Sequence, residues 1–166
     1  MGLDDAIGTD VAWATANTST VIDRVLARQP SVAEHLAEAH RQTWQALDPI
    51  LLELVRLRVA MLLGCEAELA ERTPAAVDAG LDEAMVAELP SWPTSPLYGP
   101  RERACLAFVE QWVIDVASLS DDDASAVSEV LGPDGLATFA AALLVIEQRQ
   151  RLRLAWQQLF GKENAS

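Results

Sequence analysis

The stretch LDPILLELVRLRVAMLLGCEAELAERTPAAVDAG, residues 47–80, contains the strongest indication of the fold. Asp48 followed by Pro49 is typical of a helix start, with the aspartate as N-cap and the proline in the first turn. Residues 50–63 are apolar almost all round and carry Glu53, Arg56 and Arg58 as their only charges. Because no face of such a helix favours water, we expect it at the centre of the protein.

Helix signals also precede this stretch. Residues 1–17 are small, polar and weakly patterned, and we expect a loose arm there. A helix is predicted over residues 19–28, stopped by Pro30, and a second helix begins after it with Ser31 as N-cap and Glu34 as capping-box partner. The apolar periodicity of this second helix places six residues on one face: Val32, Leu36, His40, Thr43, Trp44 and Leu47.

Downstream of the central helix the pattern remains helical. Gly64 and Cys65 interrupt it, and we predict a further helix over residues 66–79 with an irregularity at Thr73 and Pro74. Gly80 is a good helix stop, and Asp82 can cap a short helix that runs to residue 89. Residues 90–100 contain four prolines and are predicted to form a structured loop.

The last part of the chain predicts three more helical features. An amphipathic face comprises Cys105, Phe108, Val109, Trp112 and Val116. Ser120 is a predicted N-cap followed by acids that suit the helix dipole, and a long helix is expected over residues 136–160. No segment resembles a strand, so the predicted fold class is all-α. We expect one helical domain over residues 18–161, followed by a tail of residues 162–166.

Composition narrows the function classes. The 166 residues are 51% hydrophobic with a net charge of −13, which disfavours binding to nucleic acid or to an anionic membrane. No secretory signal is visible, and the longest apolar run, residues 140–146, is too short to span a bilayer. Cys65 and Cys105 give no disulfide framework, so a cytoplasmic location is expected. Neither metal-ligand spacing nor a phosphate-binding glycine loop is present, and we predict no metal and no cofactor.

Residues 47–80 resemble the core helix pair of the alkylhydroperoxidase (AhpD-like)/carboxymuconolactone decarboxylase superfamily. Its peroxidase-like members have a glutamate on the first helix and a Cys-x-x-Cys-x-x-x-His motif on the second. On this resemblance Glu53 matches the glutamate, and Cys65, twelve residues later, matches the first cysteine. Glu68 stands at the second cysteine and Arg72 at the histidine. The resemblance therefore implies an AhpD-like helical domain with a degenerate motif.

The resemblance extends over residues 45–158. The segments AGLDEAMVAEL, SW, SPLY and RERACLAFVE, within residues 79–110, are similar to the family's next helix, loop and helix. QRLRLAW, residues 150–156, is similar to its closing helix. Family members assemble as trimers or hexamers, so a homo-oligomer is implied here, with residues 137–146 and Trp156 as natural interface material.

The two departures from the motif disfavour a standard dithiol peroxidase cycle. Glu68 cannot resolve a sulfenic acid formed on Cys65, and an arginine at position 72 cannot release its proton near neutral pH. The lactone decarboxylase members resemble this sequence differently, because they lack the cysteine pair and carry glutamate near this position. Their histidines, however, are absent from the segment.

Each candidate residue also has a simpler structural interpretation. Cys65 is either a nucleophile or a small residue packed at a helix junction. Glu53 either takes part in chemistry or pairs with an arginine, such as Arg56 or one from the last helix. Glu68 either belongs to the site or is a solvated residue that bridges to Arg72 at i+4.

The other reactive side chains are expected to be structural. Cys105 is predicted to lie in the core, and His40 is expected to be a hydrogen-bonded packing histidine. The basic cluster near the C-terminus either binds an anionic ligand or, as we expect, pairs with acids of a neighbouring helix or subunit: Arg149, Arg151 and Arg153.

Three hypotheses for function follow. The first is a family enzyme with altered chemistry on a small molecule, in which the candidate catalytic residues are Cys65 and Glu53, with Glu68 and with Arg72 at the histidine position. The second is a catalytically silent binding or assembly subunit that kept the fold. The third is a decarboxylase or isomerase that acts on a small organic acid.

Overall fold

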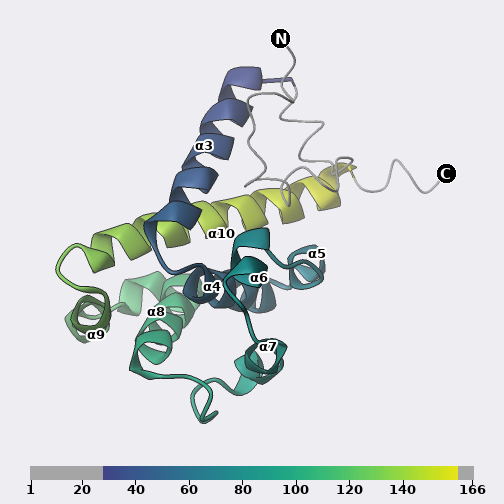
Figure 1. Cartoon of the computed structure of the whole chain (residues 1–166). Helices are drawn as coiled ribbons and strands as arrows, with labels where there is room; N and C mark the ends of the chain where they lie inside the picture. Colours follow the sequence, from purple (N-terminus) through teal and green to yellow (C-terminus); the bar gives the residue numbers. More distant parts are fainter. Residues whose placement is uncertain (1–27, 161–166) are drawn as a thin grey trace.

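The computed structural model describes residues 28–160, and every regular element in that range is a helix (Figure 1). The predicted arm (1–17), nearly all of the predicted helix over 19–28 and the tail (162–166) lie outside the described residues. The elements are α3 (Pro30–Ala46), α4 (Pro49–Leu63), α5 (Glu66–Leu69), α6 (Pro74–Asp78), α7 (Glu83–Glu88), η3 (Leu89–Ser91), α8 (Pro100–Asp115), η4 (Val116–Ser118), α9 (Asp121–Leu131) and α10 (Gly135–Phe160). The prediction of an all-α fold is confirmed.

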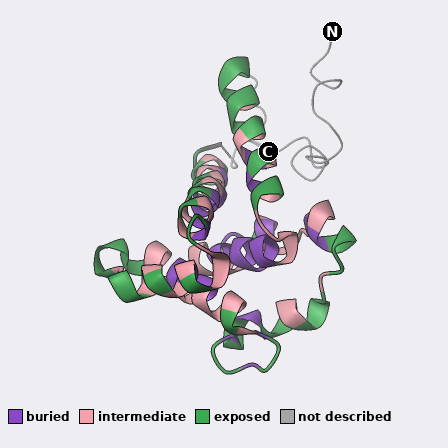
Figure 2. Ribbon diagram, turned by 60° about the vertical axis from the view of Figure 1, so that its left-hand side comes forward, coloured by how far each residue is buried: buried purple, intermediate pink, exposed green. Residues whose placement is uncertain are grey.

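Helix α4 is the central element, as predicted. Its start is fixed by Asp48, whose side chain accepts a hydrogen bond of 2.9 Å from the backbone N–H of Leu51. Its end is fixed by Gly64, which has a φ of 69° and donates its N–H to the carbonyls of the last turn. A side chain at that backbone conformation would be strained, so glycine suits the position. The helix at the centre of Figure 2 is buried along almost all of its length.

Two apolar clusters pack against opposite sides of α4. On one side, α8, α9 and α10 contribute to a cluster around Leu51, Val55 and Val59. On the other side, α8 and the loop before it enclose Leu54 and Leu57. Fully burying one such side chain stabilises the fold by about 1.5–3 kcal/mol. Polar side chains on α4 can therefore be held only where other polar groups meet them.

Helix α3 projects from the body and meets α10 through its C-terminal half (Figure 1). His40 and Thr43 are its buried residues, whereas Val32 and Leu36 are exposed despite lying on the predicted apolar face. The predicted capping box of Ser31 and Glu34 is wrong, because the helix begins at Pro30 with Gln29 as N-cap and no side-chain cap. Proline suits a first helical position, since its missing N–H has no partner to lose there.

The predicted helix over residues 66–79, with its irregularity at Thr73 and Pro74, is divided at that point into two helices, and the break is longer than the irregularity that was predicted. The structure has two short helices, α5 and α6, separated by residues 70–73. Pro74 disfavours helical backbone at the residue before it. The carbonyls of Glu68 and Glu71, which a continuous helix would use internally, instead accept hydrogen bonds from Arg56. Pro74 therefore disfavours a continuous helix, and the hydrogen bonds from Arg56 stabilise the broken segment.

The remaining boundaries agree closely with expectation. Asp82 caps α7 through the N–H of Ala84, and Ser120 forms a capping box with Asp123 at the start of α9. Val116 is an exception, because α8 ends before it and its side chain is exposed. Among the described helices, none is by itself long and apolar enough to cross a bilayer; α9 and α10 pass that test only together, with a bend of 106° between them.

Candidate functional site

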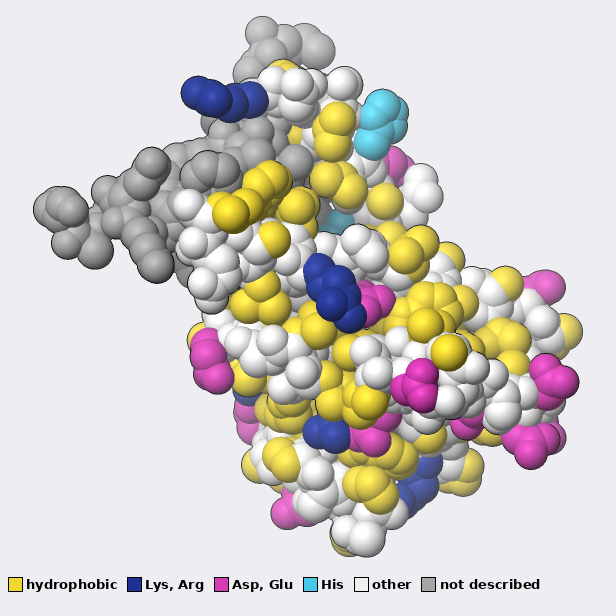
Figure 3. Space-filling view, turned by 180° about the vertical axis from the view of Figure 1, so that it is seen from behind, with side chains coloured by type: hydrophobic (Ala, Val, Ile, Leu, Met, Phe, Trp, Pro, Cys, Tyr) yellow, Lys and Arg dark blue, Asp and Glu magenta, His cyan; other side chains and the backbone are white. Residues whose placement is uncertain are grey.

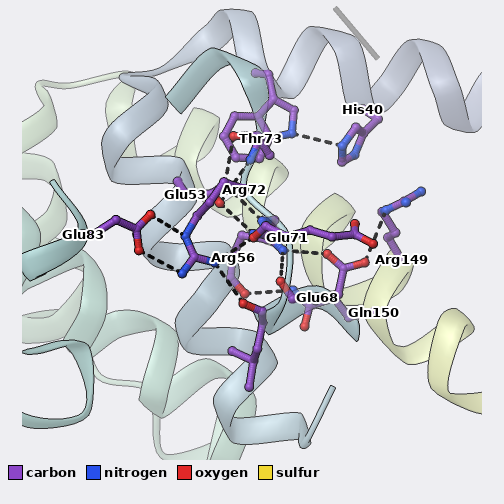
Figure 4. Close-up of polar contacts among 12 residues, drawn as sticks. His40, Glu53, Arg56, Glu68, Glu71, Arg72, Thr73, Glu83, Arg149 and Gln150 are labelled. Carbon is purple, nitrogen blue, oxygen red and sulfur yellow. Dashed lines mark hydrogen bonds and ion pairs between the residues drawn. The ribbon is translucent and has the colours of Figure 1, made fainter. Parts of the chain in front are cut away.

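A cluster of charged side chains joins α4, the α5–α6 segment and α10 (Figure 4). Its members Glu53, Arg56, Glu68 and Arg153 are each at most 6% exposed. Burying an ionised group is costly unless it is paired and hydrogen-bonded. The details of the pairing therefore decide what this cluster can do.

Arg56 is the centre of the cluster, and each of its five N–H groups has an acceptor. Its Nε and Nη2 form a two-pronged ion pair with the carboxylate of Glu53, at 3.1 and 2.6 Å. Its Nη1 donates to a carboxylate oxygen of Glu68 at 2.8 Å and to the backbone carbonyl of Glu68 at 2.7 Å. Nη2 also donates to the carbonyl of Glu71 at 2.7 Å. This guanidinium therefore joins α4 to the α5–α6 segment.

Glu53, the candidate catalytic glutamate, is fully occupied. Besides Arg56, its two oxygens accept hydrogen bonds from the backbone N–H of Thr73 at 3.2 Å and from the Thr73 hydroxyl at 2.9 Å. With four donors on one buried carboxylate, its ionised form is well compensated. Of the two interpretations left open for Glu53, the structure shows the pairing with an arginine, and the partner is Arg56.

Glu68 is surrounded by arginines from two helices. One oxygen accepts from Arg56, and the other accepts from Arg153 of α10 at 2.7 Å and lies 3.8 Å from Nε of Arg149. Burial acts to raise the pKa of Glu68, but the three guanidiniums outweigh burial and lower the pKa below its ordinary value. The simpler interpretation of Glu68 as a solvated residue that bridges to Arg72 is wrong, because its side chain is fully buried and faces α10.

Helix α10 closes the cluster through one of its faces. Arg153 bonds to Glu71 at 3.3 Å as well as to Glu68, and the amide of Gln150 donates to the backbone carbonyl of Arg56 at 2.9 Å. The expectation that the C-terminal arginines pair with acids of a neighbouring helix is confirmed for Arg149 and Arg153. Arg151 differs, because it pairs with Glu147 on its own helix.

Cys65 lies at the start of α5, next to the cluster, and its side chain is fully buried. Burial raises the pKa of the Cys65 thiol above its ordinary value, although the backbone N–H of Glu68 acts in the opposite direction. At neutral pH the thiol is therefore protonated, and a protonated thiol is a poor nucleophile. Cys105 is a free, buried cysteine on α8, as expected for a core residue, and burial raises its pKa to about 12.

Arg72 does not join the other candidate residues. Its guanidinium forms an ion pair with Glu83 of α7 at 2.9 Å and donates to the backbone carbonyls of Leu69 and Glu71. The structure thus brings Cys65, Glu53 and Glu68 to one place and holds Arg72 on the outer side of the segment.

His40 of α3 is a neighbour of the cluster that the sequence did not connect with it. Its Nε2 accepts a hydrogen bond of 3.0 Å from Trp44, which confirms the expected packing role. Burial and the nearby Arg149 lower the pKa of His40 to about 3, so the imidazole is neutral at physiological pH.

Thr73 and Gln150 are two further members of the cluster that the sequence did not predict. Their types carry no charge, and only the fold places them beside Glu53 and Arg56.

The cluster is electrically balanced. Its three carboxylates face three guanidiniums: Glu53, Glu68 and Glu71 with Arg56, Arg149 and Arg153. An acid or base that is ionised and paired in this way is poorly suited to exchange a proton near neutral pH. Within residues 28–160, no three His, Cys, Asp or Glu side chains are arranged to hold a metal ion. In this conformation the cluster is therefore a buried network of ion pairs, and its carboxylates and guanidiniums are occupied by one another.

Comparison with known proteins adds two findings. Residues 30–111 match the carboxymuconolactone decarboxylase family. Uncharacterized proteins from two strains of Mycobacterium tuberculosis are each 34% identical to this chain over 90 residues, which is 54% of this chain and 32% of theirs. The matched segment thus spans about a third of the length of those relatives.

The fold has a relative among solved structures. A protein of unknown function from Agrobacterium tumefaciens, described as a candidate antioxidant defence protein AhpD, superposes with a TM-score of 0.69. The likeness covers 80% of this chain and 92% of that one at 18% sequence identity. At that identity the likeness concerns the fold, which is AhpD-like as predicted.

Proposed function

We propose that this chain, whose residues 30–111 match the carboxymuconolactone decarboxylase family, is a family member without a dithiol peroxidase cycle, acting as a binding or assembly subunit. The resemblance matches Glu53, Cys65, Glu68 and Arg72 to the family's motif. In this chain we assign structural roles to these four positions. The observation that carries the proposal is Arg56, whose five donors are all used to hold Glu53, Glu68 and the adjoining backbone.

The state of Cys65 supports the same conclusion. A peroxide-reducing cysteine must be accessible and ionised, whereas this thiol is buried and protonated. A second thiol is also needed to resolve a sulfenic acid. Cys105, on α8, packs in the apolar core among Phe108 and Val109 and not in the charged cluster.

Exposed apolar side chains support an assembly role. Val32 and Leu36 on α3 are 46% and 44% exposed, and Leu144 and Leu159 on α10 are 49% and 65% exposed. Figure 3 shows hydrophobic side chains spread across the face seen from behind, interspersed with polar atoms and with several charged side chains. Large apolar side chains left exposed on two neighbouring helices are candidates for burial at a protein interface. We propose a homo-oligomer, of three or six chains by the family resemblance.

The proposal is tested by peroxide turnover with a dithiol reductant, measured on the wild-type chain and on the matched variants Cys65→Ser and Cys105→Ser. We expect all three proteins to consume peroxide no faster than the reductant alone. Intact mass after mild peroxide should show either no change or added oxygen. Sustained turnover that Cys65→Ser abolishes and Cys105→Ser keeps would instead support the altered-chemistry enzyme.

One observation favours a second candidate function, decarboxylation or isomerisation of a small organic acid. The fold brings a buried imidazole, His40, to the charged cluster, although the cluster's own segment contains no histidine. Its low pKa makes this imidazole a weak base, so we rank this function second. If the wild-type chain converts carboxymuconolactone and His40→Gln does not, this second function would rank above the binding or assembly role.

A further inference from the structure

We propose that residues 64–80, comprising α5, the intervening loop and α6, form a strap that opens as one unit and controls access to the Cys65 thiol. The Arg56-centred network is the fastening that holds the strap closed. This inference goes beyond the proposed function and does not depend on it, because it concerns access to a thiol and not turnover.

The apolar contact of the strap is limited and includes the partly buried Leu69, which packs against the cluster around Leu54 and Leu57. Within residues 64–80 the buried side chains are Cys65, Glu68, Thr73 and Ala76, and two of these four are polar. Val77 of α6, by contrast, is 57% exposed. Segments with few buried apolar contacts are the ones that open locally at low free-energy cost.

Polar contacts from outside the strap supply the attachment. Arg56 binds the carboxylate and carbonyl of Glu68 and the carbonyl of Glu71. Glu53 accepts two hydrogen bonds from Thr73, and Arg153 bonds to Glu68 and Glu71. These contacts share donors and acceptors, so breaking one of them weakens the others. The strap is therefore expected to be released as a unit.

The ends and the helices of the strap suit such an opening. Gly64 and Gly80 bound it, and both have positive φ, of 69° and 85°. Helices as short as α5 and α6, with four and five residues, are not stable without tertiary contacts. Helix α4, on which the strap rests, keeps its own cap and its two apolar clusters. Opening of the strap can therefore occur while the core remains folded.

Access to Cys65 follows from its position within the strap. In the closed state its side chain is fully buried at the first turn of α5, and its backbone N–H bonds to the carbonyl of Ala60 at 2.9 Å. In the open state the thiol meets solvent and ionises with the ordinary pKa of a cysteine. Cys105, on α8, is an internal reference, because it can react only when the apolar core opens.

The test measures alkylation rates of both cysteines in the same chain, with iodoacetamide and peptide mass analysis. Arg153→Met removes the hydrogen bonds from α10 to Glu68 and Glu71, and Thr73→Val removes the hydroxyl that bonds to Glu53. Their matched controls are Arg151→Met, whose pair lies within α10, and Thr138→Val, whose hydroxyl bonds to the carbonyl of Asp134 just before α10. We expect both strap variants to accelerate Cys65 labelling by roughly tenfold or more. Labelling of Cys105, and of both cysteines in the controls, should change little.

A second measurement needs no variant. In the wild-type chain, the labelling rate of Cys65 should rise with urea along a shallower slope than that of Cys105, because local opening exposes less surface than global unfolding. Equal rates and equal slopes for the two thiols would overturn the proposal, since both would then report global unfolding. Unchanged Cys65 labelling in Arg153→Met and Thr73→Val would overturn it as well.

Discussion

Replacing Arg56 with methionine is the sharpest perturbation of this protein, because the methionine roughly preserves side-chain bulk and removes only the charge and the donors. Arg56 is 2% exposed and serves two buried carboxylates, Glu53 and Glu68. Its loss leaves each carboxylate with fewer partners, although Glu53 keeps Thr73 and Glu68 keeps Arg153. We therefore expect the variant to have a lower free energy of unfolding than the wild-type chain.

The magnitude follows from the contacts that are lost. Removing one partner of a buried ion pair costs about 3–5 kcal/mol, and each carbonyl left without its donor adds about 1–3 kcal/mol at most. Because Glu53 and Glu68 retain other donors, we expect the free energy of unfolding to fall by the middle of the range for one broken ion pair, about 4 kcal/mol. A domain is stable by only about 5–15 kcal/mol in total. In a chain of this size that loss lowers Tm by about 8–16 °C.

Urea and thermal unfolding, followed by far-ultraviolet circular dichroism, measure this loss. Arg151→Met is the control, because the Arg151–Glu147 pair has a half-exposed arginine and is worth about 0.5 kcal/mol. Adding Glu53→Gln to Arg56→Met should recover part of the stability, since the uncompensated charge disappears. A loss below about 1 kcal/mol in Arg56→Met would refute the conclusion that this guanidinium holds the cluster together.

Three further predictions concern pH, assembly and the motif. The pKa of His40 is lowered from 6.5 to about 3, so the unfolded state binds its proton first, and stability should fall as pH drops below 6.5. Glu68 adds a loss only below its ordinary value of 4.5, so His40→Gln should flatten the unfolding free energy between pH 6.5 and 4.5. Light scattering at micromolar concentration should give a multiple of 18.0 kDa, and a mass near 18.0 kDa itself would reject the homo-oligomer. Glu68→Cys, which restores the family's second cysteine on the proposed alignment, should lower Tm without producing peroxide turnover; turnover in this variant would show that only the resolving thiol was missing.

The features that the sequence predicted correctly depend on neighbours along the chain. The N-caps at Asp48, Asp82 and Ser120 each bond within three residues, and the pairing of Glu53 with Arg56 joins positions one helical turn apart. The periodicity of α4 likewise needs no knowledge of its partners. These elements were therefore predictable from local physical chemistry.

The features that the sequence missed depend on distant partners. Glu68 pairs with Arg153, which lies 85 residues further along the chain, and Gln150 reaches Arg56 across 94 residues. The spacing of Arg149 and Arg153 does indicate a shared face of the last helix, but it does not say which helix that face meets. The irregularity at Thr73 and Pro74 was predicted from the proline, but the full break over residues 70–73 was not, because the bonds from Arg56 of α4 to the carbonyls of Glu68 and Glu71 leave no signal in the local sequence.

Glu68 and its arginines depend on one another, and this dependence explains why the site is closed. A cysteine at position 68 would be small and neutral, and it could not balance both Arg56 and Arg153 in a buried place. Conversely, a glutamate there could not remain ionised without those guanidiniums, because burial opposes its charge. Because Glu68 bonds to both Arg56 and Arg153, it links the strap to α4 and α10 at the same time, and the side chain of Cys65 within the strap is buried. One carboxylate thus provides both the electrostatic balance of the cluster and the burial of the thiol.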